Sequence, residues 1–123
     1  MPGKHHIEIH VRPEFRAENS EEGRYVFVYH VSIKNSGLMS VQLLRRHWFI
    51  VDGNEHLEEV VGDGVVGEQP LLNPGDEYAY SSFCVLGTPV GCMHGHYTFI
   101  DEQGLEFPED IPIFTLADIL SVQ

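Results

Sequence analysis

The chain has 123 residues, 42% hydrophobic and 21% charged, which is long enough and apolar enough to bury a core without disulfides or a metal. Its net charge of −12 argues against nucleic acid and against an anionic membrane surface, because Lys and Arg side chains hold those phosphates. No apolar run approaches the roughly 20 residues of a membrane span, and no signal-peptide core follows the N-terminus. We therefore expect one cytoplasmic domain over residues 1–123.

Alternation of apolar and polar residues predicts strands along most of the chain. Between 25 and 33 every odd position is large and apolar or aromatic, so one face of that strand should meet a core. Trp48 is expected to anchor that core. Turns are predicted at 52–54, 87–89, 101–104 and 107–108, and one helical turn is compatible with 116–122. The predicted strands cover about 7–11, 25–33, 41–51, 56–61, 78–86, 93–100 and 111–116.

These short, regularly spaced strands predict an all-β fold, an antiparallel β-sandwich of about seven strands with an immunoglobulin- or fibronectin-III-like architecture. Cys84 and Cys92 lack the spacing of an immunoglobulin disulfide, which favours the fibronectin-like variant. Their spacing could place them on neighbouring strands of a hairpin. Reduced thiols are the default for a cytosolic protein, and the sequence leaves open whether these two cysteines are paired.

A G-x-G-x-x-G string occupies Gly62, Gly64 and Gly67, the spacing used by dinucleotide-binding loops. That motif needs a helix after the glycines, because the pyrophosphate rests on the N–H groups of the helix N-terminus. Here Pro70 and the 73–76 segment break any helix. All seven Lys and Arg residues lie at or before Arg46, so a polyphosphate would be repelled unless a metal or the Arg45–Arg46 pair came alongside. A loop in a β protein is the favoured interpretation.

An ordered series of motifs resembles the ApaG (CorD) family over about 7–116: GDGVVGEQP at 62–70, LNPG at 72–75, YSS at 80–82, TPVG at 88–91, MHGHY at 93–97 and PIFTL at 112–116. The resemblance implies a small fibronectin-III-like sandwich without an established enzymatic activity. In bacteria the family is associated with cobalt resistance and magnesium efflux. In eukaryotes similar domains are appended to F-box and polymerase-interacting proteins, where they look like protein-binding modules. The family's motif defines no catalytic residue.

The residues themselves offer little nucleophilic chemistry. Ser81 and Ser82 fall inside a strand pattern, whereas a serine nucleophile needs a strained elbow. No Lys or Arg follows Arg46, so nothing positive nearby would lower a cysteine pKa. The acidic pairs 58–59 and 109–110 are sequence neighbours, and each pair therefore splits between two faces or lies in solvent.

Cys92, His94 and His96 form the one pattern with metal-ligand character, because an extended strand points all three to one face and Met93 to the other. Such a face suits Zn²⁺ or Co²⁺ if a neighbouring strand adds a ligand. The alternative is ordinary exposed strand residues, with Gly95 allowing another segment to pack closely. The alternating His6, Glu8 and His10 are interpreted as edge-strand charge that blocks aggregation.

The sequence thus predicts a non-enzymatic protein-binding module with an unidentified protein partner and no cofactor, although a divalent metal stays open. The predicted partner surface is the region around 62–75, through exposed Val65, Val66, Leu71 and Leu72. The alternative is that these side chains cap the core. Two other functions are left open: a small-ligand or metal-cation sensor using Cys92, His94 and His96, and a nucleotide- or pyrophosphate-binding enzyme using the glycine string.

Overall fold

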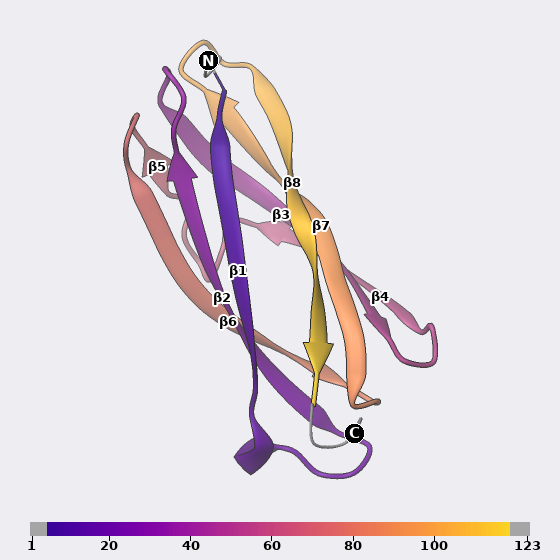
Figure 1. Ribbon diagram of the computed structural model, residues 1–123. Coiled ribbons are helices and arrows are strands. Elements are labelled where there is room, and N and C mark those ends of the chain that lie inside the picture. Colours follow the sequence, from indigo (N-terminus) through magenta and orange to yellow (C-terminus); the bar gives the residue numbers. More distant parts are fainter. Residues whose placement is uncertain (1–4, 119–123) are drawn as a thin grey trace.

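A computed structural model describes residues 5–118, which form two packed antiparallel sheets (Figure 1). The smaller sheet has the order β1-β2-β6, and the larger has the order β4-β3-β7-β8 with the short β5 also paired to β3. All seven predicted strands are present, so the predicted sandwich is confirmed. The strands are β1 (Ile7–Phe15), β2 (Tyr25–Asn35), β3 (Val41–Asp52), β4 (Leu57–Asp63), β5 (Leu71–Leu72), β6 (Glu77–Leu86), β7 (Val90–Asp101) and β8 (Glu106–Ala117). The sequence did not predict β5 or the 3-10 turn η1 (Ala17–Asn19).

The core lies between the two sheets, and each long strand contributes alternate side chains to it. In β3 the buried parity changes at a register shift between Leu43 and Arg45, from odd positions before it to Trp48 and Ile50 after it. The odd positions of β2 from Phe27 to Ile33 are buried, as the alternation predicts. Trp48 on β3 is 2% exposed and meets Tyr29, Tyr97 and Phe114 edge-on, with ring centroids 5.4, 6.1 and 5.9 Å away. Edge-to-face contacts of this kind add to the free energy of burial, which confirms Trp48 as the core anchor.

The fourth strand pairs with β3 in the larger sheet, instead of joining β1 and β2 as in a constant-type immunoglobulin domain. The fold is therefore the fibronectin-like variant. In the described chain no helix has the length and apolar character that crossing a membrane requires.

Two details of the sequence prediction are wrong. Cys84 and Cys92 do not share a hairpin, because β6 and β7 belong to different sheets and the 87–89 turn crosses between them. Both are free thiols. The turn predicted at 107–108 is instead part of β8, since an edge strand tolerates Pro108 where the missing N–H would face outward. Of the helical turn suggested at 116–122, the first two residues belong to β8 and residues 119–122 lie outside the described chain.

Each sheet has two edge strands, and the two sides of the sandwich differ. On one side β1 lies against β8 (Figure 1). There His5 stacks on Phe107 at 3.7 Å and its Nε2 lies 2.8 Å from Asp101 Oδ2, so side chains close the gap between the sheets. On the other side β6 faces β3 and β4, and cavities remain between the sheets.

Candidate functional site

The glycine string begins in β4, which contains Gly62, and continues through a tight loop to β5. No helix follows it within the described residues, as the sequence predicts. Val65 and Glu68 exchange two main-chain hydrogen bonds of 2.8 and 2.9 Å, which fold the loop back on itself. Gly64 and Gly67 have φ values of +62° and +80°, which favour glycine. A Cβ on Gly64 would lie 2.2 Å from the Glu68 carbonyl oxygen, so only glycine fits this approach.

Arg46 braces the loop from inside, and the sequence analysis did not single out this role. Its guanidinium lies across Gly62, where a Cβ would be 2.7 Å from Nη2. Nη1 donates to the carbonyl oxygens of Asp63 and Gly64 at 2.9 and 3.0 Å. No carboxylate of the described residues lies within ion-pairing distance of Arg46, whereas the neighbouring Arg45 points outward and pairs with Glu106. The alternation of β3 distinguishes Arg46 from Arg45 in the sequence. Arg46 is two and four residues from the inward-facing Trp48 and Ile50, and therefore points to the same face.

The predicted partner surface needs correction. Val65 is fully buried and Leu72 is 3% exposed, so neither presents a side chain to a partner. Val66 and Leu71, in contrast, are 62% and 63% exposed. Within β5 the alternation points Leu72 into the core and Leu71 outward, and the turn at Gly64 directs Val65 into the core. Half of the proposed set caps the sandwich, and half remains available for contact.

Two cavities follow one another along the open side, between β6 and the β3–β4 pair. One, of about 150 Å³, is lined by Arg46 and Val66 together with Tyr80 and Ser82 of β6. The other, of about 250 Å³, is lined by Asp52, His56 and Glu58 together with Val85 and Leu86 of β6. The open side therefore carries a fixed positive charge at one end and carboxylates at the other.

Three core-facing titratable side chains, those of Tyr80, Cys84 and Tyr97, stay protonated at neutral pH. Burial raises the pKa of the Tyr80 and Tyr97 hydroxyls, which hydrogen bond to each other. Burial, with a smaller contribution from the charge of Glu58, raises the pKa of the Cys84 thiol to about 12. A thiol of this kind is a poor nucleophile, because the thiolate is the reactive form.

The predicted metal ligands lie on the outer face of the larger sheet. Cys92, His94 and His96 are half-buried there, and Met93 on the opposite face is fully buried, so the predicted alternation is confirmed. The rings of His94 and His96 pack on Phe49 and His47 of β3, with centroids 5.1 and 5.0 Å apart. Within residues 5–118 no group of three or more His, Cys, Asp or Glu side chains is placed to hold a metal ion. The predicted ligand set is therefore not assembled in this structure.

Gly95, between the two histidines, has the close-packing role that the sequence suggested. A Cβ there would lie 2.0 Å from the His47 carbonyl oxygen. The glycine thus lets β7 approach β3 closely, and this approach brings the histidine rings of the two strands together.

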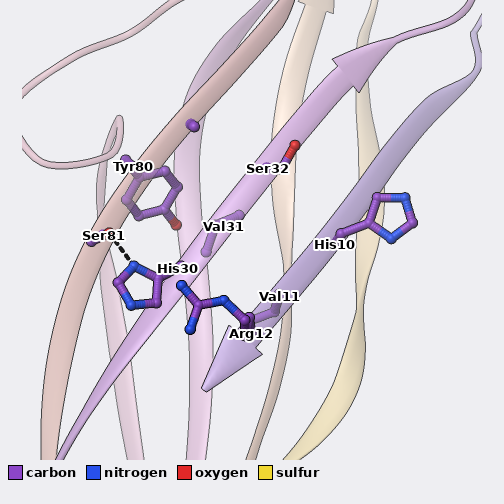
Figure 2. Close-up of a pocket in the computed structure, with 9 residues that line it drawn as sticks. His10, Val11, Arg12, His30, Val31, Ser32, Tyr80 and Ser81 are labelled. Atoms are coloured by element: carbon purple, nitrogen blue, oxygen red, sulfur yellow. Dashed lines mark hydrogen bonds between the residues drawn. The ribbon is translucent and has the colours of Figure 1, made fainter. Parts of the chain in front are cut away.

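A shallow depression of about 420 Å³ on the outer face of the smaller sheet holds a polar chain that the sequence analysis missed (Figure 2). His30 Nδ1 lies 2.6 Å from Ser81 Oγ, and its Nε2 lies 3.2 Å from Glu14 Oε1. The order serine, histidine, carboxylate is that of a hydrolytic triad. However, Ser81 is directly opposite His30 in a regular β2–β6 ladder rather than on a strained elbow, and Glu14 also pairs with Arg12 and Arg16. We interpret the chain as cross-strand pairing that stabilises the sheet.

Comparison with known proteins gives consistent matches. The family model described as the ApaG domain matches residues 16–101. The Protein ApaG of Anaeromyxobacter dehalogenans is 52% identical over 111 residues, covering 90% of this chain and 89% of that protein. The Protein ApaG of an Escherichia coli O1:K1 strain is 55% identical over 94 residues, covering 76% and 75%. A crystal structure described as the putative ApaA protein from Bordetella pertussis matches with a TM-score of 0.93 and 42% identity, covering 95% of this chain and 97% of that one.

Proposed function

The chain belongs to the ApaG family, and from that premise we propose that it is a non-enzymatic protein-binding module whose partner contacts the loop between β4 and β5. The observation that carries the proposal is the pair Val66 and Leu71, two apolar side chains more than 60% exposed, the first in this loop and the second at the start of β5. Exposed apolar side chains that recur within one short segment favour an interaction site.

The rigidity of the loop supports the same proposal. The Val65–Glu68 hydrogen bonds and the Arg46 guanidinium fix the backbone that presents Val66. A surface that is already ordered loses little conformational entropy on binding, so even a small apolar contact contributes usefully to affinity.

Nucleotide binding is the less favoured alternative. The space directly beside the Gly62 and Gly64 backbone is already filled by the Arg46 guanidinium and the Glu68 carbonyl group. A phosphate would have to displace these groups to reach the glycines. A direct cation-sensing role likewise lacks an assembled ligand group among residues 5–118. We propose that any link between this protein and cobalt or magnesium homeostasis acts through its protein partner.

The test compares quantitative affinity capture from the native cells for the wild type and for Val66→Ser/Leu71→Ser. A matched control is Leu105→Ser/Ile113→Ser, which alters exposed apolar residues elsewhere. We expect the loop variant to keep its melting temperature and lose a partner that the control retains. A folded loop variant that retains every partner would overturn the proposal.

A further inference from the structure

We propose that the partner binds as an extended strand added to the free edge of β6, with an acidic side chain on Arg46 and a basic side chain on Glu58. This inference rests on the proposed protein-binding function and specifies the kind of segment that the open side of the sandwich accepts. Strand addition of this kind combines main-chain hydrogen bonds for affinity with alternate side chains for specificity.

The first observation is that β6 is the unprotected edge of the molecule. Its ladder with β2 runs for ten residue pairs without a bulge, and no other described strand pairs with it. β6 contains no proline, and Glu77 is its only charged residue. Phe83 and Val85 point outward at 65% and 40% exposure. The other edges carry the usual protection: proline and charge in β1 and β8, and three carboxylates in the short β4.

The second observation is the pair of charges beside this edge. Arg46 lines the cavity next to Tyr80 and Ser82, half-buried and without a carboxylate partner among the described residues. Glu58 lines the next cavity, beside Val85 and Leu86. In a chain of net charge −12, an unpaired and partly desolvated guanidinium is a specific site for a carboxylate, because bidentate hydrogen bonds suit that group.

The spacing of the two charges defines the partner sequence. Glu58 lies opposite Ile50 in the β3–β4 register, and Ile50 is four residues from Arg46. Four residues of strand span about 13 Å, and side chains four apart point to the same face. A complementary segment therefore has an acid and a base at positions one and five. Positions two and four face outward, where apolar side chains would pack beside Phe83 and Val85.

A peptide segment fits this edge better than a second copy of the chain. Pairing β6 with another β6 would place Tyr80, Ser82 and Cys84 toward the cavities. None of these side chains carries a charge that could neutralise Arg46 or Glu58. Each copy also carries the same net charge of −12, which opposes self-association.

The experiment uses the full chain and short capped peptides built around Lys-Val-Ser-Val-Glu, the antiparallel order, with Glu-Val-Ser-Val-Lys as the parallel order. A third peptide moves both charges by one position, so that they would face outward. Binding is measured by fluorescence anisotropy, and the site by hydrogen exchange of the β6 amides. We expect binding of the antiparallel order above all, with protection of alternate β6 amides, because antiparallel pairs are slightly more stable per residue.

Matched variants test the charges. Arg46→Gln should weaken binding about tenfold, and the adjacent but outward-facing Arg45→Gln should not. Because Arg46 also braces the loop, Glu58→Lys on an exposed position gives a second test: it should weaken binding of the original peptide, and replacing the peptide lysine by glutamate should restore it. Restored binding between the Glu58→Lys protein and the glutamate peptide would show that the variant is folded and that the pairing of opposite charges sets the affinity.

Three outcomes would overturn the inference: no protection of β6 by either peptide order, equal binding of the shifted peptide, or a concentration-dependent dimer whose interface protects β6. If Val66→Ser/Leu71→Ser still loses its native partner in that case, the binding function stands and only the strand-addition mode fails. If that variant also retains every partner, the proposed function fails as well.

Discussion

Adding a single methyl group to each loop glycine should have very different costs. Gly67→Ala meets no atom within 4 Å, so its only penalty is the left-handed backbone at φ +80°. That strain costs about 1–2 kcal/mol and is partly offset because alanine restricts the unfolded chain. Gly64→Ala carries the same strain at φ +62° and also places Cβ 2.2 Å from the Glu68 carbonyl oxygen.

The clash at Gly64 can be relieved only by moving the loop backbone. Moving Glu68 breaks its two hydrogen bonds with Val65, each contributing about 1 kcal/mol, and disturbs the burial of Val65 itself, which contributes up to about 2 kcal/mol. We therefore expect Gly64→Ala to lower the free energy of unfolding by about 3–5 kcal/mol, against about 1 kcal/mol for Gly67→Ala. At roughly 3–5 °C per kcal/mol for a domain of this size, the melting temperatures should differ by about 10 °C.

Urea titration and thermal melting followed by circular dichroism measure both quantities. Gly62→Ala should fall between the other two variants, because its clash is with the Arg46 guanidinium, at the end of a flexible side chain. Equal costs for Gly64→Ala and Gly67→Ala would show that the glycines are not required by contacts within the loop. The structural explanation of the string would then be refuted.

Four further outcomes follow from the same contacts. Val65→Ser should destabilise the fold by about 2–4 kcal/mol in urea titration, whereas Val66→Ser should change it by less than about 0.5 kcal/mol; comparable effects would contradict their difference in burial. Calorimetry with Mg²⁺-nucleotides should give no heat of binding, and a micromolar signal would revive the glycine motif. Untagged protein should contain no stoichiometric zinc or cobalt, so a metal lost on His94→Ala/His96→Ala would restore the predicted ligand site. A hydrogen bond from His5 lowers the pKa of Asp101, with further help from main-chain N–H donors, so the folded state binds fewer protons there than the unfolded state. Its stabilisation is present above the unfolded pKa of about 4 and is lost as pH falls through the folded value. Asp101→Asn should therefore flatten the loss of stability below about pH 4, and an unchanged slope would refute this assignment.

Strand parity made much of the fold predictable from sequence. It placed Trp48 in the core and separated Met93 from the histidines on either side of it, because each assignment depends only on local alternation. Local pattern failed where a residue's environment depends on distant segments. The burial of Val65 follows from how a glycine turn returns the chain, and Pro108 is accepted because β8 is the last strand of its sheet.

The candidate site was harder to predict, because its features arise only from how the sheets meet. The free edge of β6 follows from the strand order, since β5 and β4 both pair with β3 and leave β6 one neighbour. Arg46 could have been singled out by its parity, as an inward-facing charge between apolar positions. The lack of a carboxylate partner for Arg46 among residues 5–118 depends on which carboxylates come near it in space, and the sequence alone does not contain that information.

The glycine string resembles a phosphate-binding loop because both structures must let a polar group approach the backbone closely. In a dinucleotide fold the approaching group is the pyrophosphate, which accepts hydrogen bonds from N–H groups at a helix N-terminus. Here the approaching groups are the Arg46 guanidinium at Gly62 and the Glu68 carbonyl at Gly64. The Arg46 guanidinium donates hydrogen bonds to backbone carbonyl oxygens of the loop, whereas a bound phosphate accepts hydrogen bonds from backbone N–H groups. A phosphate in the same place would face those acceptors, so the loop geometry that requires glycine also disfavours the ligand that the motif suggests.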